Sequence, residues 1–193
     1  MTINKFIASK VRLKIIKQYI FNPQQNYHIR ELVRILKDEV NAVRRELINL
    51  ERAGLLKSQR QANRICYSLN TEYNLLPEMR AIAHKEYGLG LQIMKNKKQL
   101  GDLSFAMLTY TFITLSESSS DDLDLIIVGS PDERILEVVV KNAEEELKRD
   151  IFYMIMSEKE WQARLKRRDA QAMSAVLLPH VLLMGDPLNL ATL

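Results

Sequence analysis

Two aspartates separated by one residue are the part of this sequence best suited to chemistry. Asp122 and Asp124 stand in DDLDLIIVG, at the entrance to an apolar run typical of a buried strand. Alternate strand residues point the same way, so the two carboxylates could share a magnesium ion that aligns attacking and leaving oxygens. The nearest candidate for a third carboxylate is Asp150. The alternative is a polar strand entrance, in which the aspartates hold a turn through hydrogen bonds.

The segments around this pair alternate between strand and helix patterns. We expect strands near residues 105–114, 123–128 and 151–156, helices near 133–147 and 158–168, and a further apolar run at 181–184. Elements of this number and length predict a small mixed α/β domain over residues 102–193.

The first 70 residues predict three helices followed by a hairpin. Apolar residues at helical spacing run through SKVRLKIIKQYI, HIRELVRILK and EVNAVRRELINLERAG, with Ser9 as an N-cap and Gly54 at the end of the third helix. A very short connection around Asp38 joins the last two helices, as in a helix-turn-helix. Strand-like runs at 55–58 and 64–69 then flank a basic loop. Together these patterns predict a winged helix, and an α+β fold class for the chain.

Charge is distributed unevenly along the chain. Residues 1–100 carry 19 Lys and Arg against 8 Asp and Glu, a net charge of +11, whereas residues 101–193 carry 9 against 16, a net charge of −7. Opposite signs predict two domains with different partners, and the basic half favours a polyanion such as nucleic acid. We therefore expect a DNA-binding domain at 1–72 and a helical linker or dimer seam at 73–101.

The candidate DNA contacts lie on the third helix and on the hairpin. Asn41, Arg44 and Arg45 stand off the apolar stripe near the start of the helix, and Arg60 and Arg64 stand in the hairpin. Arginine pairs bidentately with guanine and asparagine with adenine in the major groove, while a basic wing follows the backbone or the minor groove. Two alternatives stay open: a solvated helix face, or a winged helix that binds protein and has no affinity for DNA.

Other classes of site and location are disfavoured by composition. Cys66 is the only cysteine, and His28, His84 and His180 are far apart without ligand spacing, so disulfide frameworks and multi-cysteine zinc sites are excluded. No apolar run approaches the roughly 20 residues of a membrane span, and the first residues lack the apolar core of a signal peptide. We expect a cytoplasmic protein with no membrane partner.

The N-terminal half resembles the winged-helix domain of ArsR-type bacterial and archaeal transcription regulators. The most specific stretch is RELINLERAGLL, followed by a wing that ends in YSLN. The resemblance implies binding of double-stranded DNA by Asn41, Arg44 and Arg45, with Arg60 and Arg64 on the wing. Metal-sensing members use cysteine clusters, which this sequence lacks. We expect a homodimer, because a single winged helix makes few phosphate contacts and two half-sites multiply affinity.

The C-terminal half is similar to minimal nucleotidyltransferase domains of the DNA polymerase β type, particularly those fused to winged-helix regulators. The resemblance rests on DDLDLIIVG, ELKRDIFYMIMSEKEWQARL and LLPHVLLMGD. Active members carry a Gly-Ser turn about a dozen residues before the aspartates, where glycine lets the backbone approach a triphosphate. Here that position is YTFIT, and no glycine lies between Gly101 and Gly129. We expect an inactive domain without a cofactor; the alternative is an active magnesium-dependent nucleotidyltransferase using Asp122 and Asp124.

Overall fold

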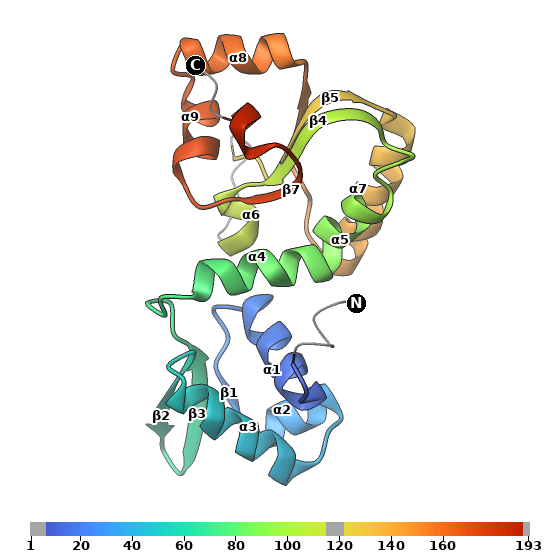
Figure 1. The fold of residues 1–193 in the computed structure, drawn as a ribbon. Helices are drawn as coiled ribbons and strands as arrows, with labels where there is room; N and C mark the ends of the chain where they lie inside the picture. The colour runs from blue at the N-terminus through green and yellow to red at the C-terminus, as the bar shows by residue number, and fades with distance from the viewer. Residues whose placement is uncertain (1–6, 115–121, 191–193) are drawn as a thin grey trace. The chain divides into compact units, whose positions relative to one another are not determined.

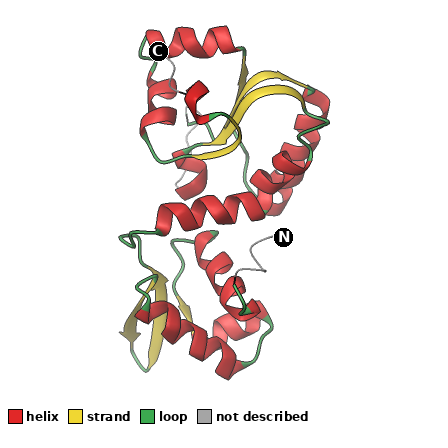
Figure 2. Cartoon of the chain, in the orientation of Figure 1, coloured by secondary structure: helices red, strands yellow, loops and turns green. Residues whose placement is uncertain are grey.

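The computed structural model of the chain describes residues 7–114 and 122–190. The chain divides into two compact units, Met1–Ala83 and His84–Leu193, and the division falls within the segment expected to be a linker. Helices and two separate sheets make up the fold, so the expected mixed α+β class is confirmed (Figure 1 and Figure 2). Within the described residues, no helix combines the length and the apolar character that crossing a membrane requires.

The first unit contains three helices and a small three-stranded sheet. Strand β1 pairs with β3, and β3 with β2, all antiparallel. The three helices and the hairpin match the sequence prediction, whereas the two-residue strand β1 was not predicted. The elements are α1 (Lys10–Ile20), β1 (Tyr27–His28), α2 (Ile29–Leu36), α3 (Val40–Arg52), β2 (Leu56–Gln61), β3 (Arg64–Leu69) and, at the boundary with the second unit, α4 (Leu76–Glu86).

The core of this unit joins the helices to the sheet. Leu32, Val43 and Leu47 are fully buried where α2 and α3 meet, and Tyr19 of α1 is fully buried beside them. The Tyr19 hydroxyl donates to the carbonyl of Tyr67 at 3.0 Å. Burial raises the pKa of Tyr19, so the hydroxyl keeps its proton and serves as a donor. One buried hydrogen bond therefore ties α1 to the central strand of the sheet.

Local capping fixes where the helices begin and end. The Ser9 side chain accepts from the Arg12 amide at 3.2 Å, so its prediction as an N-cap is confirmed. Lys37 adopts the left-handed conformation, with φ of 52°, and ends α2. Glu39 then caps α3 by accepting from the Ala42 amide at 2.8 Å. Backbone hydrogen bonds at Asn41 and Ala42 lower the pKa of Glu39, so a charged carboxylate stands at the positive end of α3.

A partly buried ion pair joins α3 to α1. Arg12 Nε lies 2.8 Å from Glu46 Oε2, and Glu46 is only 4% exposed. Burial by itself raises the pKa of Glu46, but hydrogen bonds from Arg12, Ser9 and Asn49 outweigh burial and leave the pKa below its usual value. Glu46 therefore stays ionised and holds α3 in a fixed orientation against α1.

The second unit is built on a four-stranded sheet with the strand order β6-β5-β4-β7. Strands β5 and β6 are parallel and are connected through α7, and the other pairs are antiparallel. The elements are α5 (Gly88–Lys95), β4 (Gly101–Leu108), α6 (Tyr110–Thr114), β5 (Leu125–Pro131), α7 (Glu133–Leu147), β6 (Tyr153–Met156), α8 (Glu158–Lys166), α9 (Ala170–Leu177), β7 (Val181–Gly185) and the 3₁₀ helix η2 (Pro187–Leu190).

Helices pack on the sheet of the second unit. Phe105 and Ile126 point toward α8 and α9, where Phe105 meets the buried Trp161 ring edge-on at a centroid distance of 5.3 Å. Side chains alternate along a strand, so Ala106 and Ile127 face the opposite side. On the β7 side, α5 approaches so closely that a Cβ on Gly90 would lie 2.9 Å from Leu183 Cδ2 and 2.2 Å from the His84 carbonyl. A side chain at position 90 would therefore clash first with the backbone of α4 and then with Leu183 of β7.

One expectation for this unit was wrong, and one helix was not predicted. The strand predicted over residues 105–114 ends at Leu108, and residues Tyr110–Thr114 form helix α6. The Thr109 amide donates to the Asp124 carbonyl at 3.0 Å and the Thr114 hydroxyl bonds back to the Tyr110 carbonyl at 2.8 Å, so tertiary pairing and local helical bonds override the β-branched composition. Helix α9 was not predicted, because its small apolar residues carry no clear period.

Replacing Glu46 tests the bond between α1 and α3. We expect Glu46→Gln to lower the free energy of unfolding at pH 7 by roughly 1 to 3 kcal/mol, since a charge-assisted hydrogen bond becomes one between Arg12 and a neutral amide. The pKa of Glu46 is lowered on folding, so its contribution is present above the unfolded-state pKa of about 4.3 and disappears as pH falls through the folded value. Urea denaturation at pH 7 and in acid measures both effects. The exposed Glu78→Gln is the control, and equal stability of the two variants at pH 7 would contradict the assignment.

Candidate nucleic-acid interface and the aspartate pair

Helix α3 presents a basic face opposite its buried stripe. Asn41, Arg44 and Arg45 are all exposed, whereas Val43 and Leu47 are fully buried. Positions i, i+3 and i+4 of a helix lie on one face, so the three polar side chains form a continuous surface one turn long near the helix start. The sequence-predicted side chains are thus brought together on one exposed face.

The hairpin of β2 and β3 carries the two remaining candidate residues. Arg64 pairs with Gln61 across the ladder, and Arg60 with Ile65. The tip turns at Ala62, whose φ is 51° and whose carbonyl accepts from Arg60 Nε at 3.4 Å. Both arginines are exposed. The wing therefore ends in two basic side chains next to its turn.

Arg64 also lies beside the start of α2. Its Nη1 is 3.3 Å from Nε2 of His28, the N-cap of α2, whose Nδ1 accepts from the Glu31 amide at 3.2 Å. Because Nδ1 acts as an acceptor, the ring proton of a neutral His28 is on Nε2, and the Arg64 contact is then a close approach rather than a hydrogen bond. Sequence reasoning did not identify His28 as a neighbour of the wing, since only the unpredicted strand β1 places it there.

The acidic side chains near this interface have partners of their own. Asp38 accepts from Lys14 Nζ at 2.7 Å, Glu46 is paired with Arg12, and the Glu51 carboxylate accepts from the Ser58 hydroxyl. Glu39 caps the helix. Each of these carboxylates thus has a hydrogen-bond partner other than the α3 arginines, and Arg44 and Arg45 are exposed.

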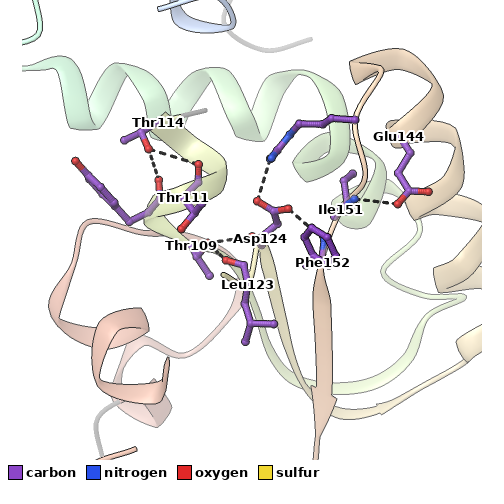
Figure 3. Close-up of polar contacts among 10 residues, drawn as sticks. Thr109, Thr111, Thr114, Leu123, Asp124, Glu144, Ile151 and Phe152 are labelled. Atoms are coloured by element: carbon purple, nitrogen blue, oxygen red, sulfur yellow. Dashed lines mark hydrogen bonds and ion pairs between the residues drawn. The ribbon is translucent and has the colours of Figure 1, made fainter. Parts of the chain in front are cut away.

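In the second unit, Asp124 is fully buried and both of its carboxylate oxygens are occupied. Oδ1 accepts from Arg149 Nη2 at 2.9 Å, and Oδ2 accepts from the Phe152 amide at 3.1 Å. The Asp124 amide donates to the Phe152 carbonyl at 2.7 Å, so main chain and side chain bind the same residue before β6 (Figure 3). Asp124 therefore links the start of β5 to the segment that leads into β6.

The partner of Asp124 comes from the end of α7. Lys148 ends the helix in the left-handed conformation, with φ of 55°, and the next residue, Arg149, turns back toward the sheet. The Arg149 guanidinium lies over the Phe112 ring, 5.2 Å from its centroid, in a cation–π contact. Sequence reasoning missed Arg149, because a basic residue between a helix and a strand looks like an ordinary exposed loop residue.

Asp122 lies in a different environment from Asp124. It is half-buried and lines a pocket of about 320 Å³ together with Tyr110 and Ser174, and Asp124 does not line this pocket. Asp150 is exposed. The polar loop at residues 115–121 lies outside the described residues, and within those residues no group of three or more His, Cys, Asp and Glu side chains is placed to hold a metal ion.

These contacts do not suit a magnesium ion shared by Asp122 and Asp124. The ion would have to displace the Arg149 guanidinium from Asp124 Oδ1. Breaking a buried pair is costly, since it leaves a charge without its partner in a site of low polarity. This arrangement of donors therefore gives no support to nucleotidyl transfer, although a cation at Asp122 and Asp124 stays a prediction.

The first unit has the element order and the antiparallel wing of a winged-helix protein. No protein-family model matches the chain. No curated protein matches it either. Among solved structures, reduced HlyU from Vibrio cholerae N16961 matches with a TM-score of 0.34 and 24% sequence identity, over 44% of this chain and 84% of that chain. At this TM-score the match carries no argument about this chain.

Removing Asp124 separates a structural role from a cation-binding role. We expect Asp124→Ala to lower the free energy of unfolding by roughly 3 kcal/mol, because it leaves the Arg149 guanidinium without its carboxylate. Asp122→Ala should cost less than about 1 kcal/mol, as expected for a partly exposed side chain. Urea denaturation followed by the fluorescence of the buried Trp161 reports on this unit. A larger loss from Asp122→Ala than from Asp124→Ala would refute the assignment.

Proposed function

We propose that this protein is a DNA-binding transcriptional regulator of the ArsR-like winged-helix type. The observation that carries the proposal is the exposed face of α3, where Asn41, Arg44 and Arg45 stand together opposite the buried stripe. A helix that enters the major groove needs base-reading side chains near its N-terminal end and a rigid attachment to its domain. The exposed α3 face supports the first requirement, and the Arg12–Glu46 pair supports the second.

The wing supports the same proposal. Arg60 and Arg64 lie on either side of its turn, and long flexible basic side chains at a hairpin tip suit contacts to phosphate oxygens. Phosphate contacts give affinity and position without sequence preference, whereas the α3 face supplies the preference. We further propose that two copies of the chain act together, because two half-sites multiply an affinity that one small module cannot supply.

The second unit is, in this proposal, a nucleotidyltransferase-like module without catalytic activity. The resemblance puts the phosphate-binding turn of active members near Tyr110–Thr114, which here is α6 and contains no glycine, and Asp124 is paired with Arg149. A tyrosine Cβ and side chain obstruct the close backbone approach that a triphosphate requires. The rival, a magnesium-dependent nucleotidyltransferase, is not favoured by these two observations.

The DNA-binding proposal is tested on full-length protein with a duplex selected from a pool of random sequences. We expect Arg44→Ala/Arg45→Ala to weaken binding to the selected duplex by several kcal/mol, since each good base contact is worth about 1 to 3 kcal/mol. The control is Lys97→Ala/Lys98→Ala, which removes the same charge from exposed sites in the second unit. Equal loss in both variants, with both folded, would show that charge alone is responsible.

The wing variant gives a different signature. Arg60→Ala/Arg64→Ala should weaken binding to selected and random duplexes about equally and reduce the slope of log affinity against log salt by about 2, because each arginine is expected to neutralise one phosphate. Fluorescence anisotropy at several salt concentrations measures both. If wild-type protein selects no duplex and binds random DNA no better than the double variants do, the winged helix binds another kind of partner.

The rival is tested by transfer of label from nucleoside triphosphates. Protein is incubated with magnesium or manganese and cell extract, alongside Asp122→Asn and Asp122→Asn/Asp124→Asn. We expect no incorporation above that of the variants, because the phosphate-binding turn is absent. Incorporation that depends on Asp122 would make the enzyme the leading hypothesis, and the Asp122→Asn single variant keeps the test valid if loss of Asp124 unfolds the unit.

A further inference from the structure

Two hydrogen-bond donors face each other where the wing meets the start of α2. His28 is the N-cap of α2, and its Nδ1 accepts from the Glu31 amide at 3.2 Å. This contact assigns the proton of a neutral imidazole to Nε2, which is then a donor. Arg64 Nη1 lies 3.3 Å from this Nε2, and a guanidinium nitrogen is always a donor. An acceptor is therefore needed to satisfy both side chains.

The surroundings of this donor pair favour an acceptor that carries negative charge. Among the residues that the structure describes, no ion pair includes His28 or Arg64. Arg64 is exposed and His28 is half-buried, so both are accessible from solvent. Arg30 in the first turn of α2 and Arg60 on the wing are also exposed, while Glu31 is the acidic residue of that turn. Positive charge thus predominates around the pair, which favours an anion from outside the chain.

The spacing of the two nitrogens suits a single oxygen atom. N–H···O hydrogen bonds are usually about 2.9 Å long, and one oxygen can lie at that distance from two nitrogens separated by 3.3 Å. A phosphate oxygen accepts more than one hydrogen bond and forms strong charge-assisted bonds with arginine. His28 comes from the junction of β1 and α2, and Arg64 comes from β3. A phosphate at this position would therefore contact the first helix of the helix-turn-helix and the wing at once.

We propose that His28 and Arg64 together bind one phosphate of the DNA backbone. His28 donates from Nε2 while its Nδ1 continues to cap α2, and Arg64 supplies the positive charge. Because phosphate contacts fix the register of a protein on the duplex, this contact sets the orientation in which α3 meets the major groove. The inference rests on the proposed DNA-binding function, and it adds His28 to the residues expected at the interface.

Two substitutions separate the donor at Nε2 from the cap at Nδ1. Asparagine is a preferred N-cap but is too short to place a donor beside Arg64, whereas glutamine can reach the position of Nε2 and is not a preferred cap. We expect His28→Asn to weaken binding to selected and random duplexes at least about fivefold, on the scale of one hydrogen bond to a charged group, without lowering the melting temperature. His28→Gln should melt at a lower temperature and bind DNA more tightly than His28→Asn.

The control variant is His180→Asn, which removes a histidine from the second unit and should leave DNA binding unchanged. Fluorescence anisotropy measures the affinities, and melting curves show that each variant is folded. Wild-type affinity in His28→Asn would overturn the proposal. Weaker binding by His28→Gln than by His28→Asn would also overturn it, because the effect of His28 would then follow the cap rather than the donor.

Neutral replacement of single phosphates tests whether His28 and Arg64 share one contact. Each phosphate of the selected duplex is replaced in turn by a methylphosphonate, which removes its charge. At one position in each half-site, we expect the replacement to weaken wild-type binding at least about fivefold. At that position the effect should be smaller in His28→Asn and in Arg64→Ala, and less than about twofold in the double variant, since both partners are then absent. Sensitive positions that differ between the two residues would refute a shared phosphate.

The same measurements distinguish failure of this inference from failure of the proposed function. If wild-type protein selects no duplex, the DNA-binding function is wrong. If it selects a duplex through Arg44 and Arg45 but His28→Asn responds to every methylphosphonate as wild type does, only the His28 contact is wrong. Calorimetric titration with inorganic phosphate covers the remaining source of the anion. Binding of inorganic phosphate that depends on His28, with no sensitive phosphate in the duplex, would assign the pair to a free anion and overturn the proposal.

Discussion

The second unit is organised around one buried carboxylate. Asp124 is fully buried, and burying a carboxylate is costly unless it is paired and hydrogen-bonded. Arg149 and the Phe152 amide provide this compensation through the side chain, and the Asp124 carbonyl accepts from the Thr109 amide. The residue thus connects the end of β4, the start of β5 and the entrance to β6. Asp124 thereby holds three segments of the sheet together.

The first unit also uses a buried carboxylate for attachment. Glu46 is buried on α3 and is held by Arg12, so one charged residue of this helix fixes it to the core while Arg44 and Arg45 face outward. Attachment through one face leaves the other face available for recognition, and a rigid attachment lowers the entropy lost on binding. The proposed interface with DNA and the core of the unit are therefore two faces of one helix.

The two aspartates that look equivalent in the sequence have separate environments in the fold. Asp122 lines an accessible pocket whose described residues carry no positive charge, whereas Asp124 is enclosed with Arg149. One carboxylate of this pair lines a surface pocket and the other is buried. The spacing of the two residues in the sequence therefore does not show that they bind one ligand together. The charges also suit the proposed partner of the first unit, because an excess of arginine on α3 and the wing favours a polyanion.

The sequence by itself determined the three helices and the wing of the first unit, because helical apolar periodicity, the Ser9 cap and the turn near Asp38 are local signals. It also placed Arg44 and Arg45 off the apolar stripe, since burial on a helix follows from period alone. Only the tertiary structure decided that residues 110–114 are helical, that β1 brings His28 beside Arg64, and that Arg149 forms an ion pair with Asp124. Each of these depends on a contact between residues distant in the chain, which no local pattern encodes.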